Sequence, residues 1–389
     1  MLLCRRELSE STTPAERVMW RSCLIWLVLV VTATAQEHSI EIAGSEELFL
    51  SHRDMNCGRA ARGSGLDVTD VPVTAFRRKD GSVVMLAGNQ NNYYLEGPSV
   101  DRARRTSCAS LVKPVNDPDP AKFTARRWLF AIHAKSYDFV LGFVHNEYHG
   151  GNFFTEGCKK SSMNAFECWY GAVGLVISRD GGFTFETPNP PDNVLAAMPF
   201  RFATGRKRVG ANTPKVVGNP NDGMTYVLVN YLDRNRDIRA YQCLLRGSGK
   251  EFNDWRAWDG HAFNMDMESP YTTERSGDCA AVLPYVVQSV KYVPAIKRFV
   301  SIGWNGPRLV YAFSENLIEW SQRRTLMEVT RKQTRRPGDP PARDYFSLLD
   351  PTSSSMNFDT LEKRPYLFFV QYTEDKRRRD LYRVPLSIQ

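Results

Sequence analysis

The segment from His145 to His149 places two imidazoles and one carboxylate at every second position of the chain. Alternate side chains of an extended strand point to one face, so His145, Glu147 and His149 are expected to lie together. A carboxyl group with a perturbed pKa suits general acid catalysis, and the imidazoles would orient it or bind hydroxyl groups. A metal site built from both imidazoles and Glu147 is one alternative, and polar side chains that only satisfy the end of a strand are another.

Acid–base chemistry of this kind needs a second carboxylate on the other side of the reacting bond. Asp70 stands just before the apolar stretch Val71–Phe76, and Asp350 stands before Pro351. We expect Asp70 to act with Glu147 and Asp350 to tune the pair. Acidic residues at other junctions between units, which would serve as alternative third carboxylates, are Asp266, Glu268 and Asp278.

Five short apolar stretches that resemble one another would position these side chains. They recur roughly every 67 to 81 residues, and each is preceded by two further strand-like runs separated by a turn. The five stretches are Tyr93–Ser99, Val173–Asp180, Ala240–Ser248, Val310–Asn316 and Asp380–Leu386. No long segment shows a sustained helical period. The pattern predicts an all-β fold, a five-bladed β-propeller, formed as a single domain by residues 36–389. Residues 39–50 are expected to add a strand that closes the ring.

The turn Ser178–Phe185 has the form S-x-D-x-G-x-T-F. Ser178 and Asp180 are expected to bind the amides of the turn, its glycines to adopt positive φ, and Phe185 to pack on the hairpin. This turn resembles the Asp box found in sialidases and other β-propellers. The resemblance implies a structural role for the turn and a propeller fold.

A second turn, Ser314–Trp320, is similar to the S-x-D-L-x-x-W turn of five-bladed glycoside hydrolases of the arabinanase, xylosidase and invertase-like families, with Asn316 in place of the Asp. Asp70-Val71-Pro72 is similar to the opening blade of those enzymes, where an Asp near the first inner strand is the base or nucleophile. The resemblance implies a glycosidase with Asp70, Glu147 and Asp350 as its carboxylates, a carbohydrate ligand in a central funnel and no cofactor.

Two other functions stay open beside the glycosidase. Sialidases share the Asp box but open with Arg-Ile-Pro, which this chain lacks, although Arg77 is placed to substitute for one clamp residue. A propeller that binds carbohydrate or protein without catalysis is the second alternative. In any of these proteins the substrate-binding residues would be Arg77, His145, His149, Tyr170 and Trp304, with Tyr170 and Trp304 stacking on a sugar ring.

The N-terminus carries the pattern of an export signal. Cys23–Val31 is an unbroken apolar run, too short to span a bilayer, and Ala33-Thr34-Ala35 offers small residues for cleavage. Residues 1–35 are therefore predicted to be a signal peptide, with Met19 as an alternative start and an uncleaved anchor as an alternative fate. Cleavage would leave a secreted protein without stable membrane insertion.

Cysteine content agrees with export. Outside the predicted signal, six of the eight cysteines remain, an even number that permits fifteen pairings. Cys158 and Cys168 bracket a polar insertion and are the pair expected to form locally.

The net charge of +8 includes local basic runs. They are Arg206–Arg208, Arg323–Arg324, Arg331–Arg336 and Lys376–Arg379. Such runs attract an anionic glycan, a membrane surface or nucleic acid, or are simply solvated loops. Because no nucleic-acid-binding module accompanies them, nucleic acid is not expected as a partner.

Overall fold

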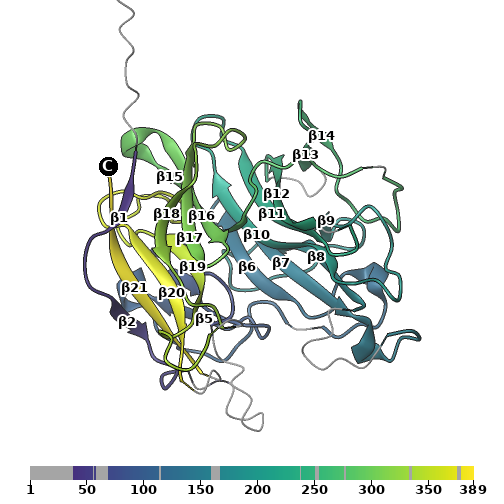
Figure 1. Ribbon diagram of the computed structural model, residues 1–389, viewed down its shortest axis with the longest axis horizontal. Coiled ribbons are helices and arrows are strands. Elements are labelled where there is room, and N and C mark those ends of the chain that lie inside the picture. Colours follow the sequence, from purple (N-terminus) through teal and green to yellow (C-terminus); the bar gives the residue numbers. More distant parts are fainter. Residues whose placement is uncertain are drawn as a thin grey trace, which may run out of the picture. The chain divides into compact units, whose positions relative to one another are not determined.

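The computed structural model shows an all-β chain, as the sequence predicts (Figure 1). The only helices among the described residues are four 3-10 turns, Val100–Arg102, Pro120–Lys122, Gly150–Phe153 and Pro294–Ile296. The predicted signal peptide, residues 1–35, lies within residues 1–37, which are outside the described residues. The structure describes residues 38–55, 57, 69–113, 115–158, 167–236, 238–249, 254–275, 277–332, 335–374 and 378–389.

Consecutive strands pair antiparallel in five groups. The first group is β3 (Thr74–Arg77), β4 (Val83–Leu86) and β5 (Tyr94–Gly97). The second is β6 (Trp128–Ala134), β7 (Val140–His149), β8 (Trp169–Ser178) and β9 (Val194–Ala196). The third is β10 (Val209–Gly218), β11 (Thr225–Asp233), β12 (Ile238–Gly247), β13 (Arg256–Trp258) and β14 (Phe263–Met265). The second and third groups share one sheet because β8 and β10 pair in parallel over two residues.

The fourth group is β15 (Val286–Val293), β16 (Arg298–Asn305), β17 (Arg308–Ser314) and β18 (Arg324–Glu328). The fifth is β19 (Arg343–Leu349), β20 (Tyr366–Tyr372) and β21 (Arg379–Ile388). Two N-terminal strands, β1 (Ile40–Ile42) and β2 (Glu47–Leu50), both pair with β21. Residues 39–50 therefore complete the sheet of the last group.

The first strand of each group lies next to the first strand of another. Contacts join β3 to β6, β6 to β10, β10 to β15 and β15 to β19. The backbone N–H of Val73, just before β3, donates to Ser347 Oγ of β19 at 3.0 Å. Buried apolar side chains fill the spaces between groups, such as Val73, Leu349 and Phe368 between the first and the fifth.

Four of these first strands carry a β-bulge. The register shifts lie between Leu129 and Ala131 in β6, Asn212 and Lys215 in β10, Val287 and Ser289 in β15, and Asp344 and Ser347 in β19. Thr213 and Tyr345 sit inside two of the bulges with φ of 45° and 53°. Bulges re-aim side chains and are common beside functional sites.

Residues 350–362, called here the closing loop, reach the last residues of the other first strands. The N–H groups of Arg77 and Tyr292 donate to carbonyl oxygens of the loop, both at 2.8 Å. Those of Ala134 and Gly218 donate to side-chain oxygens of Asn357 and Asp359, at 2.7 and 3.0 Å. All five first strands therefore end around one loop, and their starts lie at the opposite end.

Both predicted turns have the expected geometry. Asp180 Oδ1 accepts the N–H groups of Phe183 at 3.1 Å and Thr184 at 3.0 Å, while Ser178 Oγ accepts that of Gly182 at 2.7 Å. Gly181 and Gly182 have positive φ, and Phe185 packs against a core cluster. In the second turn Asn316 Oδ1 takes the place of the aspartate and accepts the N–H groups of Ile318 and Glu319.

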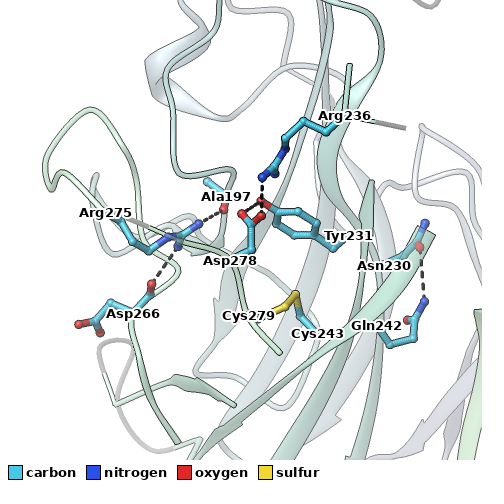
Figure 2. Close-up of a disulfide and its surroundings, with 10 residues drawn as sticks. All are labelled: Ala197, Asn230, Tyr231, Arg236, Gln242, Cys243, Asp266, Arg275, Asp278 and Cys279. Atoms are coloured by element: carbon cyan, nitrogen blue, oxygen red, sulfur yellow. Dashed lines mark hydrogen bonds and ion pairs between the residues drawn. A yellow bond between two sulfur atoms is a disulfide. The ribbon is translucent and has the colours of Figure 1, made fainter. Parts of the chain in front are cut away.

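Three disulfides join the six cysteines outside the signal segment. The predicted pair Cys158–Cys168 is confirmed, and the others are Cys57–Cys108 and Cys243–Cys279. Figure 2 shows the Cys243–Cys279 bond, which ties β12 to the linker that precedes β15. Beside it, Asp278 accepts the hydroxyl of Tyr231 and pairs with Arg236 at 2.8 Å. The disulfides restrict the unfolded chain and so stabilise the long linkers.

Candidate functional site

The three polar side chains of β7 lie together, as their spacing predicts. Glu147 Oε2 accepts a hydrogen bond from His149 Nε2 at 3.1 Å, and Glu147 Oε1 lies 3.7 Å from His145 Nδ1. The other ring nitrogen of His145 contacts Asn212 Oδ1 at 2.9 Å, within the bulge of β10. The cluster therefore spans the second and third groups of strands.

The electrostatics of this cluster keep Glu147 ionised. Burial opposes its charge, but the hydrogen bond from His149 and the charges of the neighbouring imidazoles and Arg208 lower its pKa to about 2. Burial also lowers the pKa of His145 to about 4, so His145 is neutral at physiological pH. A protonated Glu147 acting as the acid, as the sequence suggested, does not fit these surroundings.

Asp70 lies before β3, at the start of the first group. Its backbone N–H donates to Gly88 O at 2.8 Å, and its carboxylate pairs with Nη1 of Arg379 from β21. The same Nη1 donates to Thr69 O at 3.1 Å, while Nε of Arg379 is buried with no hydrogen-bond partner among the described residues. Asp70 and Arg379 keep side-chain exposures of 21% and 17%, so both remain accessible to a ligand.

Asp344 and Tyr345, at the start of β19, interact electrostatically with Asp70. Burial raises the pKa of Asp344 above its ordinary value and the charge of Asp70 raises it further, against the opposing effects of the Tyr345 amide and of Arg331. Burial, Asp70 and Asp344 together raise the pKa of Tyr345. Asp344 is thus a carboxyl group at this end that holds its proton more strongly than an exposed aspartate does.

Sequence reasoning missed Asp344 and Tyr345, although a signal for them was present. Asp344 directly precedes the apolar run Tyr345–Leu349, just as Asp70 stands shortly before Val73–Arg77. Both carboxylates occupy the start of the first strand of a group. The bulge that sets the direction of Tyr345 cannot be recognised from the residues alone.

Arg208 interacts electrostatically with both groups of residues, the one around Glu147 and the one around Tyr345. It immediately precedes β10, and its charge acts on both Glu147 and Tyr345. Its guanidinium carbon lies 4.1 Å from the ring centroid of Trp169, the first residue of β8. Glu147, Arg208, Asp344 and Tyr345 are each largely surrounded by protein yet keep some exposure to solvent.

Aromatic side chains surround this end of the strands. Trp304, near the end of β16, is 5% exposed and packs edge-on against Phe346 at 5.2 Å. Its ring faces Arg331, whose guanidinium carbon lies 4.6 Å from the ring centroid. Tyr170 is buried, and its hydroxyl donates to Phe200 O at 2.8 Å. Trp304 therefore packs in the core against Phe346 and Arg331, whereas Tyr170 packs in a separate aromatic group with Phe123 and Phe202.

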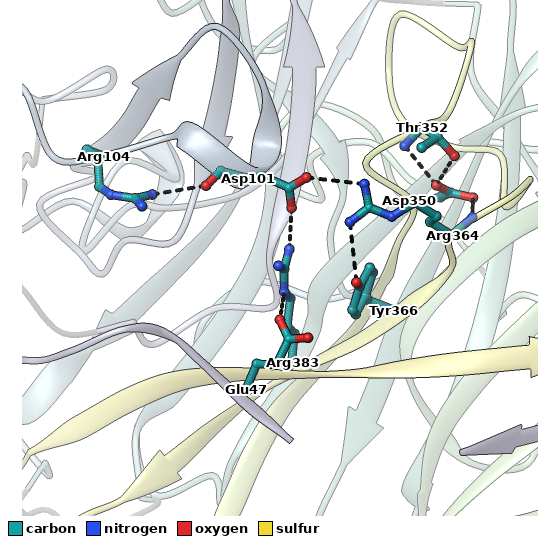
Figure 3. A network of polar contacts seen from close by, with 8 residues as sticks. All are labelled: Glu47, Asp101, Arg104, Asp350, Thr352, Arg364, Tyr366 and Arg383. Carbon is teal, nitrogen blue, oxygen red and sulfur yellow. Dashed lines mark hydrogen bonds and ion pairs between the residues drawn. The ribbon is translucent and has the colours of Figure 1, made fainter. Parts of the chain in front are cut away.

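Asp350 and Arg77 lie at the opposite end of the first strands. Asp350 is fully buried, and Figure 3 shows its carboxylate with Thr352 and Arg364. It accepts the N–H groups of Thr352, Glu362 and Arg364 and the hydroxyl of Thr352, at 2.6 to 3.0 Å. Arg77 stacks on Phe358 at 4.6 Å and donates to carbonyl oxygens of the closing loop. The structure does not bring either residue to Asp70 or Glu147.

The other predicted carboxylates also lie elsewhere. Asp266 pairs with Arg256 at 2.9 Å, and Asp278 belongs to the network beside the Cys243–Cys279 disulfide (Figure 2). Within the described ranges, no group of three or more His, Cys, Asp or Glu side chains is arranged to hold a metal ion. In the same part of the chain, no helix is long and apolar enough to cross a bilayer.

Comparison with known proteins gives likenesses of low identity. No protein-family model and no curated protein matches the chain. Among solved structures, an N-acetylgalactosamine deacetylase from F. plautii, bound to blood group B trisaccharide, has 10% identity over 90% of this chain and 95% of its own, with a TM-score of 0.47. An endo-arabinase from Bacteroides thetaiotaomicron has 8% identity over 88% and 98%, with a TM-score of 0.47.

A third solved structure, the α-L-arabinanase of Cellvibrio cellulosa, has 10% identity over 82% of this chain and 91% of its own, with a TM-score of 0.43. Identities and TM-scores this low carry no argument about what this chain does. A functional conclusion has to come from the side chains at the starts of the first strands.

Proposed function

We propose that this protein is a secreted five-bladed β-propeller that hydrolyses a glycosidic bond. Its active site would lie at the end of the fold where the first strand of each group begins. The five antiparallel groups, the contacts between their first strands and the single closing loop support the propeller. The three disulfides support export. The observation that carries the function is the electrostatic coupling between Asp70, which is ion-paired with Arg379, and Asp344, whose pKa is raised.

In this mechanism Asp344 is the general acid. It donates its proton to the glycosidic oxygen as the bond to the sugar breaks, a role for which a raised pKa is suited. Asp70, paired with Arg379, is the ionised carboxylate that takes a proton from the attacking water or attacks the sugar itself. The negative charge of Glu147 stabilises the charged form of Arg208 beside the site. Tyr345, with its raised pKa, stays a neutral hydrogen-bond donor.

A propeller that binds a glycan without cleaving it is the second candidate. The ion pair between Asp70 and Arg379 favours this alternative, because it engages the carboxylate that the chemistry requires. A binding protein would need the same accessible polar and aromatic groups but no protonated carboxyl group.

The two candidates are separated by turnover of a panel of aryl glycosides that includes arabinosides, galactosides, glucuronides and sialosides. We expect the wild-type protein to hydrolyse at least one member and Asp344→Asn to lose about 10²- to 10⁴-fold of that activity. Glu315→Gln, which removes an exposed carboxylate, is the control and should keep full activity. No turnover across the panel by protein that binds one of the sugars would establish the binding function instead.

A further inference from the structure

The fold gathers the described residues of three of the four basic runs at the end of the strands that holds the proposed site. Arg206–Arg208 immediately precede β10, and Arg331 and Lys332 lie between β18 and the start of β19. Arg378 directly precedes β21, whose first residue Arg379 pairs across the sheet with Tyr372. Because Arg343 at the start of β19 pairs with Gln371 of β20, these residues all lie beside the starts of first strands.

The fourth run lies at the other end. Arg324 begins β18 and pairs with Tyr311, at the middle of β17, and β18 runs from there towards the start of β17. The residues before Arg324 lie towards the end of β17, where Ser314 pairs with Phe299 of β16, which in turn pairs with Tyr292 near the end of β15. Arg323 and Arg324 are therefore on the side of the closing loop. They carry the same number of positive charges as Arg335 and Arg336 and so serve as an internal control.

Arginines dominate the inner part of the basic face, and aromatic rings hold their planes. Arg208 stacks on Trp169 at 4.1 Å and Arg331 on Trp304 at 4.6 Å. Arg379 lies 5.1 Å from the ring centroid of Tyr372. A guanidinium with a fixed plane is suited to bind a planar carboxylate through two parallel N–H groups, which a lysine ammonium cannot do.

Four carboxylates at this end pair with basic side chains of the fold. Their partners are already present in the fold: Arg379 for Asp70, His149 for Glu147, Arg308 for Glu328 and Arg343 for Glu46. The exposed cations Lys207, Arg336 and Arg378 extend the basic face outward from the site. The basic runs gathered here give this face a positive field, which attracts an anionic ligand.

A hollow of about 370 Å³ lies on the same face. Its lining residues are Glu328, Val329, Thr330, Pro340, Pro341 and Arg343. Arg343 is the neighbour of Asp344 in the chain, and the basic residues Arg331, Lys332, Arg335 and Arg336 belong to the segment that connects the two sides of the hollow. A volume of this size accommodates a sugar unit next to the proposed site.

We propose that the ligand is a carboxylate-bearing glycan, a polymer of uronic acids, which runs across this basic face and presents one linkage to Asp70 and Asp344. The proposal deepens the proposed function by naming its substrate class and rests on the same site. Arg208, Arg331 and Arg379 contact carboxylates of the chain near the cleavage point. The outer cations Arg206, Lys207, Arg335 and Arg336 steer more distant units.

The test is binding of polygalacturonate to the full-length Asp344→Asn protein by titration calorimetry, so that hydrolysis is not required. Neutral arabinan and galactan, sulfate-bearing dextran sulfate and single-stranded DNA are the comparison ligands. We expect polygalacturonate to bind more tightly than any of the four, with affinity that falls as salt is added. The double change Arg335→Gln and Arg336→Gln should weaken binding roughly tenfold. The matched double change Arg323→Gln and Arg324→Gln should weaken it less than about twofold.

Each contrary outcome is decisive. Equal losses from the two double changes would show that only net charge matters and would overturn the assignment to this face. Dextran sulfate or DNA binding as tightly as polygalacturonate would overturn the selection of carboxylate. Tight binding of arabinan or galactan without polygalacturonate would overturn the anionic substrate yet leave the glycosidase intact, whereas polygalacturonate binding without any turnover would leave this proposal intact and refute the glycosidase.

Discussion

The two ends of the five first strands both contain buried charged groups, but their partners differ in kind. At the closing loop, Asp350 accepts three backbone N–H groups and one hydroxyl, and Asp359 accepts the N–H of Gly218. At the starts of the strands, Asp70 and Glu147 pair instead with the side chains of Arg379 and His149. One end therefore uses carboxylates to fix the backbone, while the other directs carboxylates towards other side chains.

This difference separates structural carboxylates from candidate catalytic ones. A carboxylate whose lone pairs are all occupied by backbone donors has no capacity left for a substrate, and its loss leaves buried N–H groups unsatisfied. A carboxylate that faces another titratable side chain has a pKa that depends on that neighbour, which is how acid–base sites are built. Burial alone would have ranked Asp350 above Asp70.

The largest effect on stability is expected from Asp350→Asn. The amide group of the new side chain would face N–H donors that now bind an oxygen, so the free energy of unfolding should fall by about 3 kcal/mol. Chemical denaturation of the purified variant measures this loss, with Glu315→Gln as a control that changes stability by less than about 1 kcal/mol. An Asp350→Asn protein as stable as the wild type would remove the distinction between the two ends.

A smaller and pH-dependent loss is expected from Glu147→Gln, about 2 kcal/mol at pH 7, because Arg208 and His149 lose a charged partner. The pKa of Glu147 is lowered in the folded protein, so its contribution is present above its ordinary value of 4.5 and is lost as the pH falls towards 2. Unfolding measured across that range should therefore show the two proteins converging in acid. A difference that stays constant down to pH 2 would contradict the ionised state assigned to Glu147.

The smallest effect, and the sharpest test of the coupling, is a shift in one pKa. Asp70→Asn removes a negative charge that raises the pKa of Asp344, so that pKa should fall. Carbon-detected NMR of selectively labelled aspartate carboxyl groups measures the shift, and Asp344→Asn identifies the resonance. The same titration in Glu315→Gln should be unchanged. An unaltered pKa of Asp344 in Asp70→Asn would show that the two carboxylates do not act on each other.

The sequence was sufficient for the local structure. Strand-length runs and turn residues predicted the all-β chain, and the period of two predicted the contact between Glu147 and both histidines. Residue types did not predict at which end of a first strand a given carboxylate would lie. Asp350 and Asp70 both flank a first strand, and only the chain direction within the fold shows that one follows its strand and the other precedes it.

Asp344 and the basic face illustrate a second limit. The raised pKa of Asp344 depends on Asp70, which is far away in the sequence, and on burial within a bulged strand. The basic runs were visible in the sequence, but their collection at one end follows from strand order and pairing. Properties that arise between units of the repeat need the three-dimensional structure.

The most direct test of the account is the turnover per folded molecule of Asp344→Asn beside Asp350→Asn, on whichever glycoside the wild-type protein cleaves. We predict that Asp344→Asn folds with wild-type stability and loses about 10²- to 10⁴-fold in turnover. Asp350→Asn should be less stable, with wild-type turnover for each molecule that is folded. Full turnover by Asp344→Asn would contradict the assignment of chemistry to the starts of the strands. A loss of turnover found only in folded Asp350→Asn would contradict it as well.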